Sequence, residues 1–324
     1  MTQRFSGLDF LRAVSMIYIV GFWHLLEYTN AAPWFYHKAS LQLVVLAMSI
    51  FVAMSGYLMG ARTNTEAPAW VRKFIVTRFA RLYVPFVGAL ILFKATKLAS
   101  FEVVLNGALM TAMFVPPAPP TLWFVDMLLI FYMVGGLLLF HGQRPMTFIM
   151  IASSTLALVF LGATVWHVVD GRMLIYLPAF IWGIALARWP VIFNKTPTLA
   201  VAGALVAITA LLPESTSGHA DWYCVFGWLG SHLAIQLTRK ESTLYTSSWV
   251  QYISHASFFM YLLHRPMLKV LTSLYKPDLG LLQLAYLYLV CLPVIFITAR
   301  LTQTAYDQFA LPRIMRLKWL QASP

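Results

Sequence analysis

The sequence predicts an all-α, polytopic integral membrane bundle, and composition and hydropathy are the two observations behind this prediction. Of the 324 residues, 60% are apolar and only 10% are charged, and the mean hydropathy is +0.74. Apolar stretches close to the ~20 residues that cross a bilayer as a helix recur from one end of the chain to the other. This composition excludes an ordinary soluble globular domain.

Eleven apolar stretches are candidates for membrane spans. The fourth of them is short, contains Glu102 and Asn106, and runs into the proline-rich segment 116–120, which ends a helix and stiffens a loop. In chain order the candidates are 8–28, 40–61, 74–94, 99–115, 122–140, 147–167, 172–188, 197–212, 221–238, 254–274 and 280–300.

The positions of Lys and Arg decide whether 99–115 crosses the membrane. If it does not cross, most basic residues of the loops gather on one side, which the positive-inside rule assigns to the cytoplasm. This topology predicts about ten spans, both termini cytoplasmic, and a single domain over 1–324 in which 95–121 is an external, partly helical, non-spanning element. Its cytoplasmic basic residues are Arg4, Arg62, Arg72, Lys73, Arg144, Arg188, Lys195, Arg239, Lys240, Arg313, Arg316 and Lys318, and its external ones are Lys38, Lys94, Lys97, Arg172 and Lys276.

The loops also explain the net charge of +12, so the expected partner is the lipid bilayer and no nucleic acid. Cys224 and Cys291 lie inside apolar segments without the spacing of metal ligands, so we expect buried thiols and no metal site. Arg12 interrupts the first apolar stretch, so we interpret 8–28 as a retained span and expect no cleaved signal peptide.

The first predicted span carries four ionisable residues, Asp9, Arg12, His24 and Glu27. Each such group costs ~2.5–3.5 kcal/mol at bilayer depth, so a functional role is the default expectation. Arg12 and His24 are separated by about 18 Å of helical rise. The topology therefore places Arg12 near the cytoplasmic end of the span and His24 near the external end. Asp9, three residues before Arg12, either neutralises it or belongs to the site.

Arg78 and Arg81 share one face of the third predicted span, because they are three residues apart. Together with Arg12 they would line a cytoplasmic pocket suited to phosphate oxygens, which the planar guanidinium group binds through two donors at once. Coenzyme A is a common cytoplasmic acyl carrier that presents several phosphates. The same arginines also suit contacts with anionic lipid headgroups, and both interpretations remain open.

At the other end of the span, Glu27 lies three residues after His24 and could orient its imidazole, which would make His24 a general base. Asp126 is a second carboxylate near the external face. A histidine that only forms structural hydrogen bonds is the competing interpretation. Tyr261 and His264 form another polar cluster, for which structural hydrogen bonding and catalysis both remain open.

Ser55 lies beside Gly56 in a run that permits either close approach of a neighbouring helix or a helix break. No base adjoins Ser55, so we do not interpret it as a nucleophile. Glycine-rich phosphate loops, metal-ligand spacings and nucleophile elbows are absent from the sequence.

Five segments, in order along the chain, together resemble the membrane-bound acyltransferase-3 family. The first span, with Arg12 and His24, matches in its Gly-Leu-Asp-Phe-Leu-Arg-Ala start, and the Arg-x-x-Arg pair of the third span matches as well. The matching segments are Gly7–Ala13 leading to His24, Phe51–Leu58, Arg78–Tyr83 before Pro85, Leu122–Phe124 with Trp123, and Tyr252–Pro266.

The resemblance implies an integral membrane enzyme that transfers an acyl group, commonly acetyl, from cytoplasmic acyl-coenzyme A to a hydroxyl of a glycan or another acceptor. It implies a catalytic role for His24 and donor binding by Arg12, Arg78 and Arg81. The usual setting of the family is the bacterial inner membrane, where such enzymes O-acetylate polysaccharides.

Three features depart from the family pattern. The family usually has ten residues between the first-span Arg and His, whereas eleven separate Arg12 from His24. The extra residue rotates His24 by about 100° unless the helix contains a bulge. Many members carry a Glu where this chain has Leu128, so Asp126 or Glu27 would have to replace it. The hydrolase-like domain of some members is also not expected here.

These observations lead to the hypothesis of acyl transfer across the membrane by an O-acyltransferase that uses no metal. The acceptor hydroxyl attacks the thioester directly, although an acyl-histidine intermediate stays open. Tyr or Trp side chains are candidates to stabilise the oxyanion, although the sequence does not single one out, and Trp123 is a further candidate site residue. The alternative is a transporter or flippase for a sugar, lipid-linked glycan or small metabolite, which intramembrane charges would also serve.

Overall fold

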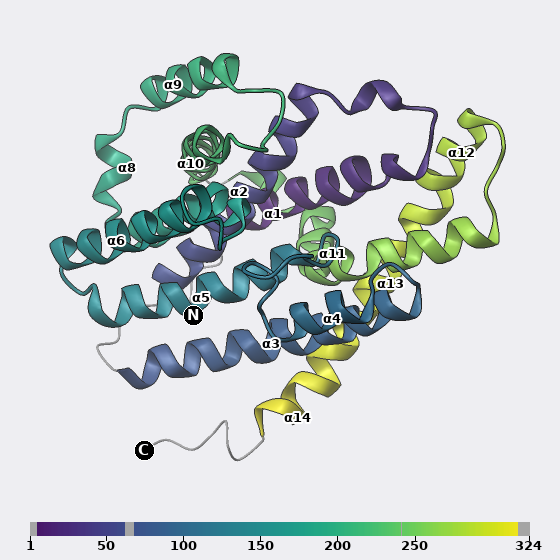
Figure 1. Ribbon diagram of the computed structural model, residues 1–324, viewed down its shortest axis with the longest axis horizontal. Helices are drawn as coiled ribbons and strands as arrows, with labels where there is room; N and C mark the ends of the chain where they lie inside the picture. The colour runs from purple at the N-terminus through teal and green to yellow at the C-terminus, as the bar shows by residue number, and fades with distance from the viewer. Residues whose placement is uncertain (1–4, 62–67, 241, 317–324) are drawn as a thin grey trace.

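The computed structural model describes residues 5–61, 68–240 and 242–316, and every regular element in these ranges is a helix (Figure 1). The first part comprises α1 (Ser6–Tyr18), η1 (Ile19–His24), η2 (Leu26–Tyr28), η3 (Pro33–Phe35), α2 (Lys38–Gly60), α3 (Pro68–Ala95), α4 (Phe101–Ala108) and α5 (Trp123–His141). The second part comprises α6 (Pro145–Thr164), α7 (Gly171–Arg188), α8 (Val191–Lys195), α9 (Thr198–Leu211), α10 (Ala220–Leu237), η4 (Thr243–Thr246) and α11 (Ser248–Leu274). A continuous helical stretch, Gly280–Met315, then contains α12 (Gly280–Tyr286), η5 (Leu287–Cys291), α13 (Leu292–Ala305), η6 (Tyr306–Ala310) and α14 (Leu311–Met315).

Within the described residues, six helical stretches are long and apolar enough to cross a membrane. The all-helical fold with several candidate membrane spans is therefore confirmed, whereas the expected ten spans and the cytoplasmic termini stay predictions. The six are Ser6–Tyr28, Lys38–Gly60, Val76–Ala95, Trp123–His141, Pro145–Thr164 and Gly280–Met315.

The segment 95–121, expected to be partly helical and non-spanning, contains α4, a helix of only 8 residues. Such a helix rises about 12 Å, far less than the ~30 Å hydrocarbon core of a bilayer. The side chain of Ser100 accepts a hydrogen bond from the Val103 N–H and caps its start. The Tyr83 hydroxyl donates to the Ala108 carbonyl oxygen (2.7 Å) and holds α4 against α3.

Hydrogen bonds between helix ends form two groups. The first group lies where α5 and α7 end. Arg188 donates to the carbonyl oxygen of Gly142 (2.8 Å), and Gln236 of α10 donates to that of Thr196 (3.0 Å). The ten-span topology places these four segments together on its cytoplasmic side. Some residues that this topology uses, namely Arg4, Arg62 and Lys318, lie outside the described residues, as do the side chains of Arg72 and Lys73.

The second group lies at the opposite ends of the helices. Lys38 at the start of α2 donates to the carbonyl oxygen of Ala210 (3.3 Å), and the N–H of Asp170 donates to that of Met113 (2.8 Å). Asp170 caps α7 and binds Arg172 through its carboxylate. Burial opposes ionisation of Asp170, but the hydrogen bonds and positive charge of Arg172 outweigh it and lower the pKa of this carboxyl.

The N-terminal helices lie at the centre of the molecule, between α10 and α11 (Figure 1). Helix α1 packs against α2 and α11, helix α7 packs against α2 and α10, and helix α3 packs against α5 and α11. Five helices, α1, α2, α3, α5 and α11, thereby surround a common space that contains the candidate site.

Helices α2 and α7 approach closely at two glycines. A Cβ added to Gly56 would lie 2.1 Å from the Phe180 carbonyl oxygen, and a Cβ added to Gly183 would lie 2.1 Å from the Ala53 carbonyl oxygen. Helix α2 is continuous through Ser55 and Gly56. Of the two possibilities that the sequence left open there, the structure contains the close helix approach and not the helix break.

Gly183→Ala is therefore expected to lower the free energy of unfolding by about 1–3 kcal/mol, the usual cost of overpacking. The backbone of α2 lies where the new methyl group would have to fit, so relief requires the two helices to separate. Thermal unfolding of the detergent-purified protein measures this effect. Gly203→Ala in α9 is the matched control, because its added Cβ meets nothing within 4 Å. Equal melting temperatures for the two variants would contradict the close-packing account.

Candidate active site

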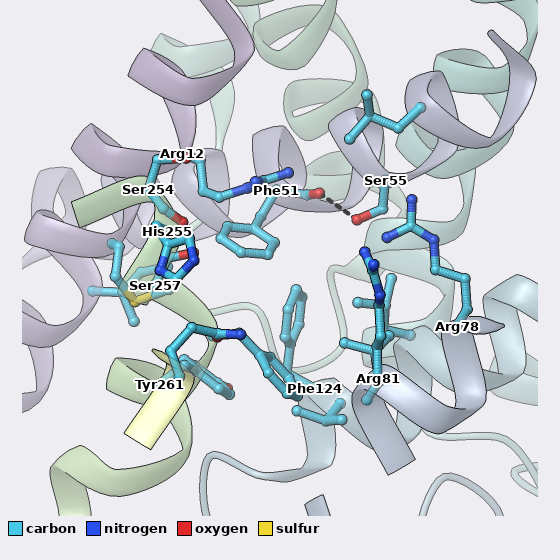
Figure 2. Close-up of a pocket in the computed structure, with 18 of the residues that line it drawn as sticks. Arg12, Phe51, Ser55, Arg78, Arg81, Phe124, Ser254, His255, Ser257 and Tyr261 are labelled. Atoms are coloured by element: carbon cyan, nitrogen blue, oxygen red, sulfur yellow. Dashed lines mark hydrogen bonds between the residues drawn. The ribbon is translucent and has the colours of Figure 1, made fainter. Parts of the chain in front are cut away.

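A cavity with an empty volume of about 1040 Å³ opens between α1, α2, α3, α5 and α11, and we call it the arginine cavity after Arg12, Arg78 and Arg81. Figure 2 shows the three guanidinium groups pointing into this space, Arg12 from α1 and the other two from α3. The three arginines that the sequence assigned to one pocket thus line one space. Guanidinium groups converging from two helices can bind an anion with several phosphate oxygens.

Asp9 contacts two residues that line this cavity, Arg12 and Ser254. Its carboxylate lies 3.8 Å from the Arg12 guanidinium and accepts a hydrogen bond from the Ser254 hydroxyl of α11 (2.8 Å). Asp9 therefore links α1 to α11 and neutralises part of the charge of Arg12. Arg78 lies over the ring of Tyr132, 5.7 Å from its centroid, and this cation–π contact orients its guanidinium group.

The remaining polar side chains of the arginine cavity come from α2, α11 and the C-terminal helices. Ser55 lines it but donates its hydroxyl hydrogen to the Phe51 carbonyl oxygen (3.0 Å), as Figure 2 shows, so that hydrogen is already committed to the helix backbone. His255 lies 3.5 Å from Asp307, which also accepts from Gln303 (2.8 Å). The sequence did not predict His255, Gln303 or Asp307 as site residues.

A second cavity, with an empty volume of about 950 Å³, lies against His24, and we call it the histidine cavity. It is lined by π-helix η1, α2, α7, α11 and the segment before α5. Both aromatic and charged side chains line its wall. Its polar and aromatic lining consists of Trp23, His24, Glu27, Thr121, Trp123, Arg172, Tyr176, Thr216, Tyr261 and Arg265.

His24 is held by a second histidine. Its side chain is 8% exposed, and its ring stacks on that of His264 with centroids 4.8 Å apart and planes within 14°. The Nδ1 of His264 lies 2.7 Å from the Tyr261 carbonyl oxygen, so this nitrogen carries the hydrogen and Nε2 carries the lone pair. Within the described part of the chain, neither Nδ1 of His24 nor Nε2 of His264 has a hydrogen-bond partner. These contacts orient both imidazole rings and leave one nitrogen of each ring able to form a further hydrogen bond.

Glu27 does not have the partner that the sequence predicted. Its carboxylate accepts a hydrogen bond from Arg265 of α11 at 2.6 Å, and the structure records this ion pair in place of a bond to His24. The three-residue rule holds for a regular α-helix, whereas the backbone changes from π to 3₁₀ winding between His24 and Glu27. Orientation of His24 therefore comes from His264.

Asp126 was the other carboxylate proposed from the sequence, and it lines neither cavity. It is fully buried in the first turn of α5. The sequence placed Asp126 correctly along the helix but carried no information about which way that turn faces. Leu128, which stands where many members of the resembled family carry Glu, lines the arginine cavity. The structure thus places neither candidate replacement acid at that position.

Trp123 lines the histidine cavity under Arg172, whose guanidinium lies 4.3 Å from the centroid of the Trp123 ring. Tyr261 lines both cavities and donates its hydroxyl hydrogen to the Thr121 carbonyl oxygen. Thr121 has a φ of 57°, a backbone conformation that β-branched residues rarely adopt. A residue in this conformation at the wall of the histidine cavity indicates that the surrounding contacts fix the position of its carbonyl.

The extra residue between Arg12 and His24 coincides with a change of helix type. Ile19–His24 form a π-helix of 6 residues between the α-helical turns of α1 and the end of the span. A π-bulge contains one residue more than the α-helical turn it replaces and keeps the following residues on their face. The bulge therefore accommodates the extra residue without the rotation of about 100° that a regular helix would impose.

A family model described as an acyltransferase domain matches residues 5–300. The chain belongs to this family, the membrane acyltransferase-3 family. No match to a curated protein or to a solved structure was found. The matched range includes every residue of both cavities except Gln303 and Asp307. Membership favours acyl transfer over the transporter or flippase that the intramembrane charges also allowed.

Arg265 could have been predicted from the sequence as a site residue of this acyltransferase, but it was not. It is a cation within a predicted apolar span, the same signal that singled out Arg12. Arg172 was assigned only to a loop by the topology. His255 had no signal in the sequence, because a lone histidine on a helix is uninformative until its neighbours are known.

Deleting Phe22, a residue of the π-helix with a 41% exposed side chain, is expected to leave the acyltransferase active. The shortened segment then forms a regular α-helix, and His24 keeps its face. Inserting an alanine beside Phe22 is expected to abolish activity, because a second extra residue rotates His24 by about 100°. Incorporation of radiolabelled acyl groups by cells that express each variant measures the difference. An inactive deletion paired with an active insertion would contradict the role of the bulge.

Proposed function

We propose that this acyltransferase binds acyl-coenzyme A in the arginine cavity and transfers the acyl group to an acceptor hydroxyl in the histidine cavity. The observation that carries the proposal is that the two cavities lie back to back. Ile19, Met48 and Tyr261 line both of them. A donor anchored among the arginines then needs to extend only its thin arm past these three side chains to reach His24.

The chemistry of the arginine cavity supports a phosphate-bearing donor. Arg12, Arg78 and Arg81 line it. Of the two acids nearby, Asp9 neutralises part of the charge of Arg12, and Asp307 lies beside His255. Bidentate guanidinium contacts suit the several phosphate oxygens of coenzyme A. The charge-derived topology places this cavity on the cytoplasmic side, where coenzyme A thioesters are available.

In the histidine cavity, His24 acts as the general base. Its imidazole takes the proton of the acceptor hydroxyl as the acceptor oxygen bonds to the thioester carbonyl carbon. The carbon–sulfur bond then breaks, and the proton passes to the leaving sulfur. The products are an ester of the acceptor and free coenzyme A thiol, and no oxidant or metal takes part.

Arg265 is the group placed to stabilise the negative charge that develops on the carbonyl oxygen. It lines the histidine cavity with a side chain only 18% exposed, and Glu27 fixes one end of its guanidinium group. The Nε of Arg265 is buried and has no hydrogen-bond partner among the described residues. A cation fixed in advance beside the reacting carbonyl supplies this kind of stabilisation at no cost in reorganisation. Tyr261 is less suited, because its hydroxyl hydrogen already binds Thr121.

The aromatic wall of Trp23, Trp123 and Tyr176 suits the faces of sugar rings, so the acceptor we propose is a glycan. With the predicted topology, the setting is O-acetylation of a polysaccharide at the outer face of a bacterial inner membrane. Purified protein incubated with acetyl-coenzyme A and a panel of oligosaccharides tests this function by release of free thiol. Thiol release that depends on an added oligosaccharide is the expected result. Failure to bind coenzyme A at all would overturn the donor assignment.

A further inference from the structure

The wall between the two cavities is formed by three side chains that are buried in this structure. Ile19 is 1% exposed, Met48 is 5% exposed and Tyr261 is 4% exposed, although each of them lines both spaces. Under the proposed function, on which this inference rests, a thioester anchored among the arginines has to cross this wall. One of the three side chains must therefore move aside.

Two of the three side chains are held in place. Tyr261 donates its hydroxyl hydrogen to the Thr121 carbonyl oxygen and packs edge-on against Phe124 at 5.6 Å. Ile19 is β-branched, and β-branching restricts rotation about χ1. It also begins the π-helix that positions His24, so a shift of its backbone would disturb the proposed base.

Met48 is different, because its side chain is unbranched and has three rotatable bonds. It lies in the middle of α2, and no hydrogen bond holds a thioether of this kind in place. Rotation of Met48 opens the wall at the lowest conformational cost of the three.

We propose that Met48 is the movable gate between the cavities and that it sets which acyl groups pass. The acyl group is the leading end of the donor arm, so it meets the gate before the rest of the molecule does. A passage made by turning one methionine between a fixed tyrosine and a stiff isoleucine favours short, unbranched acyl groups such as acetyl. The wall then selects for a short acyl group. The arginines do not, because the part of the donor that they contact is the phosphates of coenzyme A.

The test compares acetyl-, butyryl- and hexanoyl-coenzyme A as donors for wild type, Met48→Ala and Met48→Phe, with free-thiol release and coenzyme A affinity as readouts. Met48→Ala is expected to raise the butyryl-to-acetyl ratio of rates by about tenfold or more, the scale on which a pocket discriminates methylene groups. Met48→Phe is expected to slow transfer from every donor by about 100-fold, as misplacement of a reacting group does, with an unchanged coenzyme A affinity. Met54→Ala is the matched control, since Met54 lies on the same helix, is 1% exposed and lines neither cavity.

The ratio of rates is measured within one variant, so a loss of folded protein cancels from it. An unchanged ratio in Met48→Ala, or wild-type transfer by Met48→Phe, overturns the gate while leaving the proposed function intact. A wild-type protein that neither binds coenzyme A nor releases thiol overturns the proposed function and the gate together. A ratio that changes equally in Met54→Ala assigns the effect to general loosening of α2 and also overturns the gate.

Discussion

Replacing His24 by alanine is expected to lower acyl transfer by about 10²–10⁴-fold, the range that a positioned general base contributes. His24 lines the histidine cavity, and its ring is oriented by stacking on His264 and not by a carboxylate. Alanine removes the proton acceptor but leaves the arginine cavity untouched. The affinity for coenzyme A should therefore stay at its wild-type value, and kcat should carry the whole loss.

His232→Ala provides the matched control for this experiment. His232 is also a buried histidine, 3% exposed, and it accepts a hydrogen bond from the Trp182 indole, but it lines neither cavity. It should retain acyl transfer in proportion to the amount of folded protein. Transfer by His24→Ala at the rate of His232→Ala would remove His24 from the chemistry and leave it a structural histidine.

Replacing both Arg78 and Arg81 by alanine is expected to have the second large effect, on donor affinity. A hydrogen bond to a charged group contributes about 1.5–3 kcal/mol, so each lost arginine should raise the Kd of coenzyme A by about tenfold to hundredfold. Isothermal titration of detergent-purified protein with coenzyme A measures the change. Raised salt should weaken wild-type binding more than binding by the double variant, because fewer charge contacts remain to be screened.

Arg144→Ala is the control for charge alone. Arg144 lies before α6 on the same predicted side of the membrane, and it lines neither cavity. If Arg78 and Arg81 bind lipid headgroups instead of the donor, the double variant and Arg144→Ala will have the same Kd for coenzyme A. That result would restore the headgroup interpretation that the sequence left open.

The positions of the helices could be predicted from the sequence because apolar stretches of span length end where polar residues begin. The predicted span 40–61 corresponds to α2, Lys38–Gly60, and 172–188 corresponds to α7, Gly171–Arg188. The last helical stretch was predicted too short, as 280–300 against Gly280–Met315. The Thr and Gln side chains that follow residue 300 lower the hydropathy, but no Gly or Pro interrupts residues 301–311, so the helix can continue. Gln303 and Asp307 were missed for this reason.

The convergence of Arg12, Arg78 and Arg81 could be predicted, because the sequence gives both the charge of a residue and its position along a membrane span. The partner of Glu27 and the direction of Asp126 could not be predicted, because they depend on rotation about the helix axis. Local winding sets that rotation, and the π-helix at Ile19–His24 leaves no mark in hydropathy. Only the spacing of Arg12 and His24, one residue longer than the family pattern, indicated where a bulge was needed.

The central claim, that the donor enters at the arginine end and the acyl group leaves at the histidine end, is tested most directly with inside-out membrane vesicles. Acetyl-coenzyme A with a radiolabelled acetyl group is added outside vesicles that contain the chain and the glycans of the host cell. The account predicts labelled glycan inside the vesicles and free coenzyme A outside them, with wild type and not with His24→Ala. Label on glycans inside to the same extent with His24→Ala, or release of coenzyme A into the vesicle interior, would contradict it.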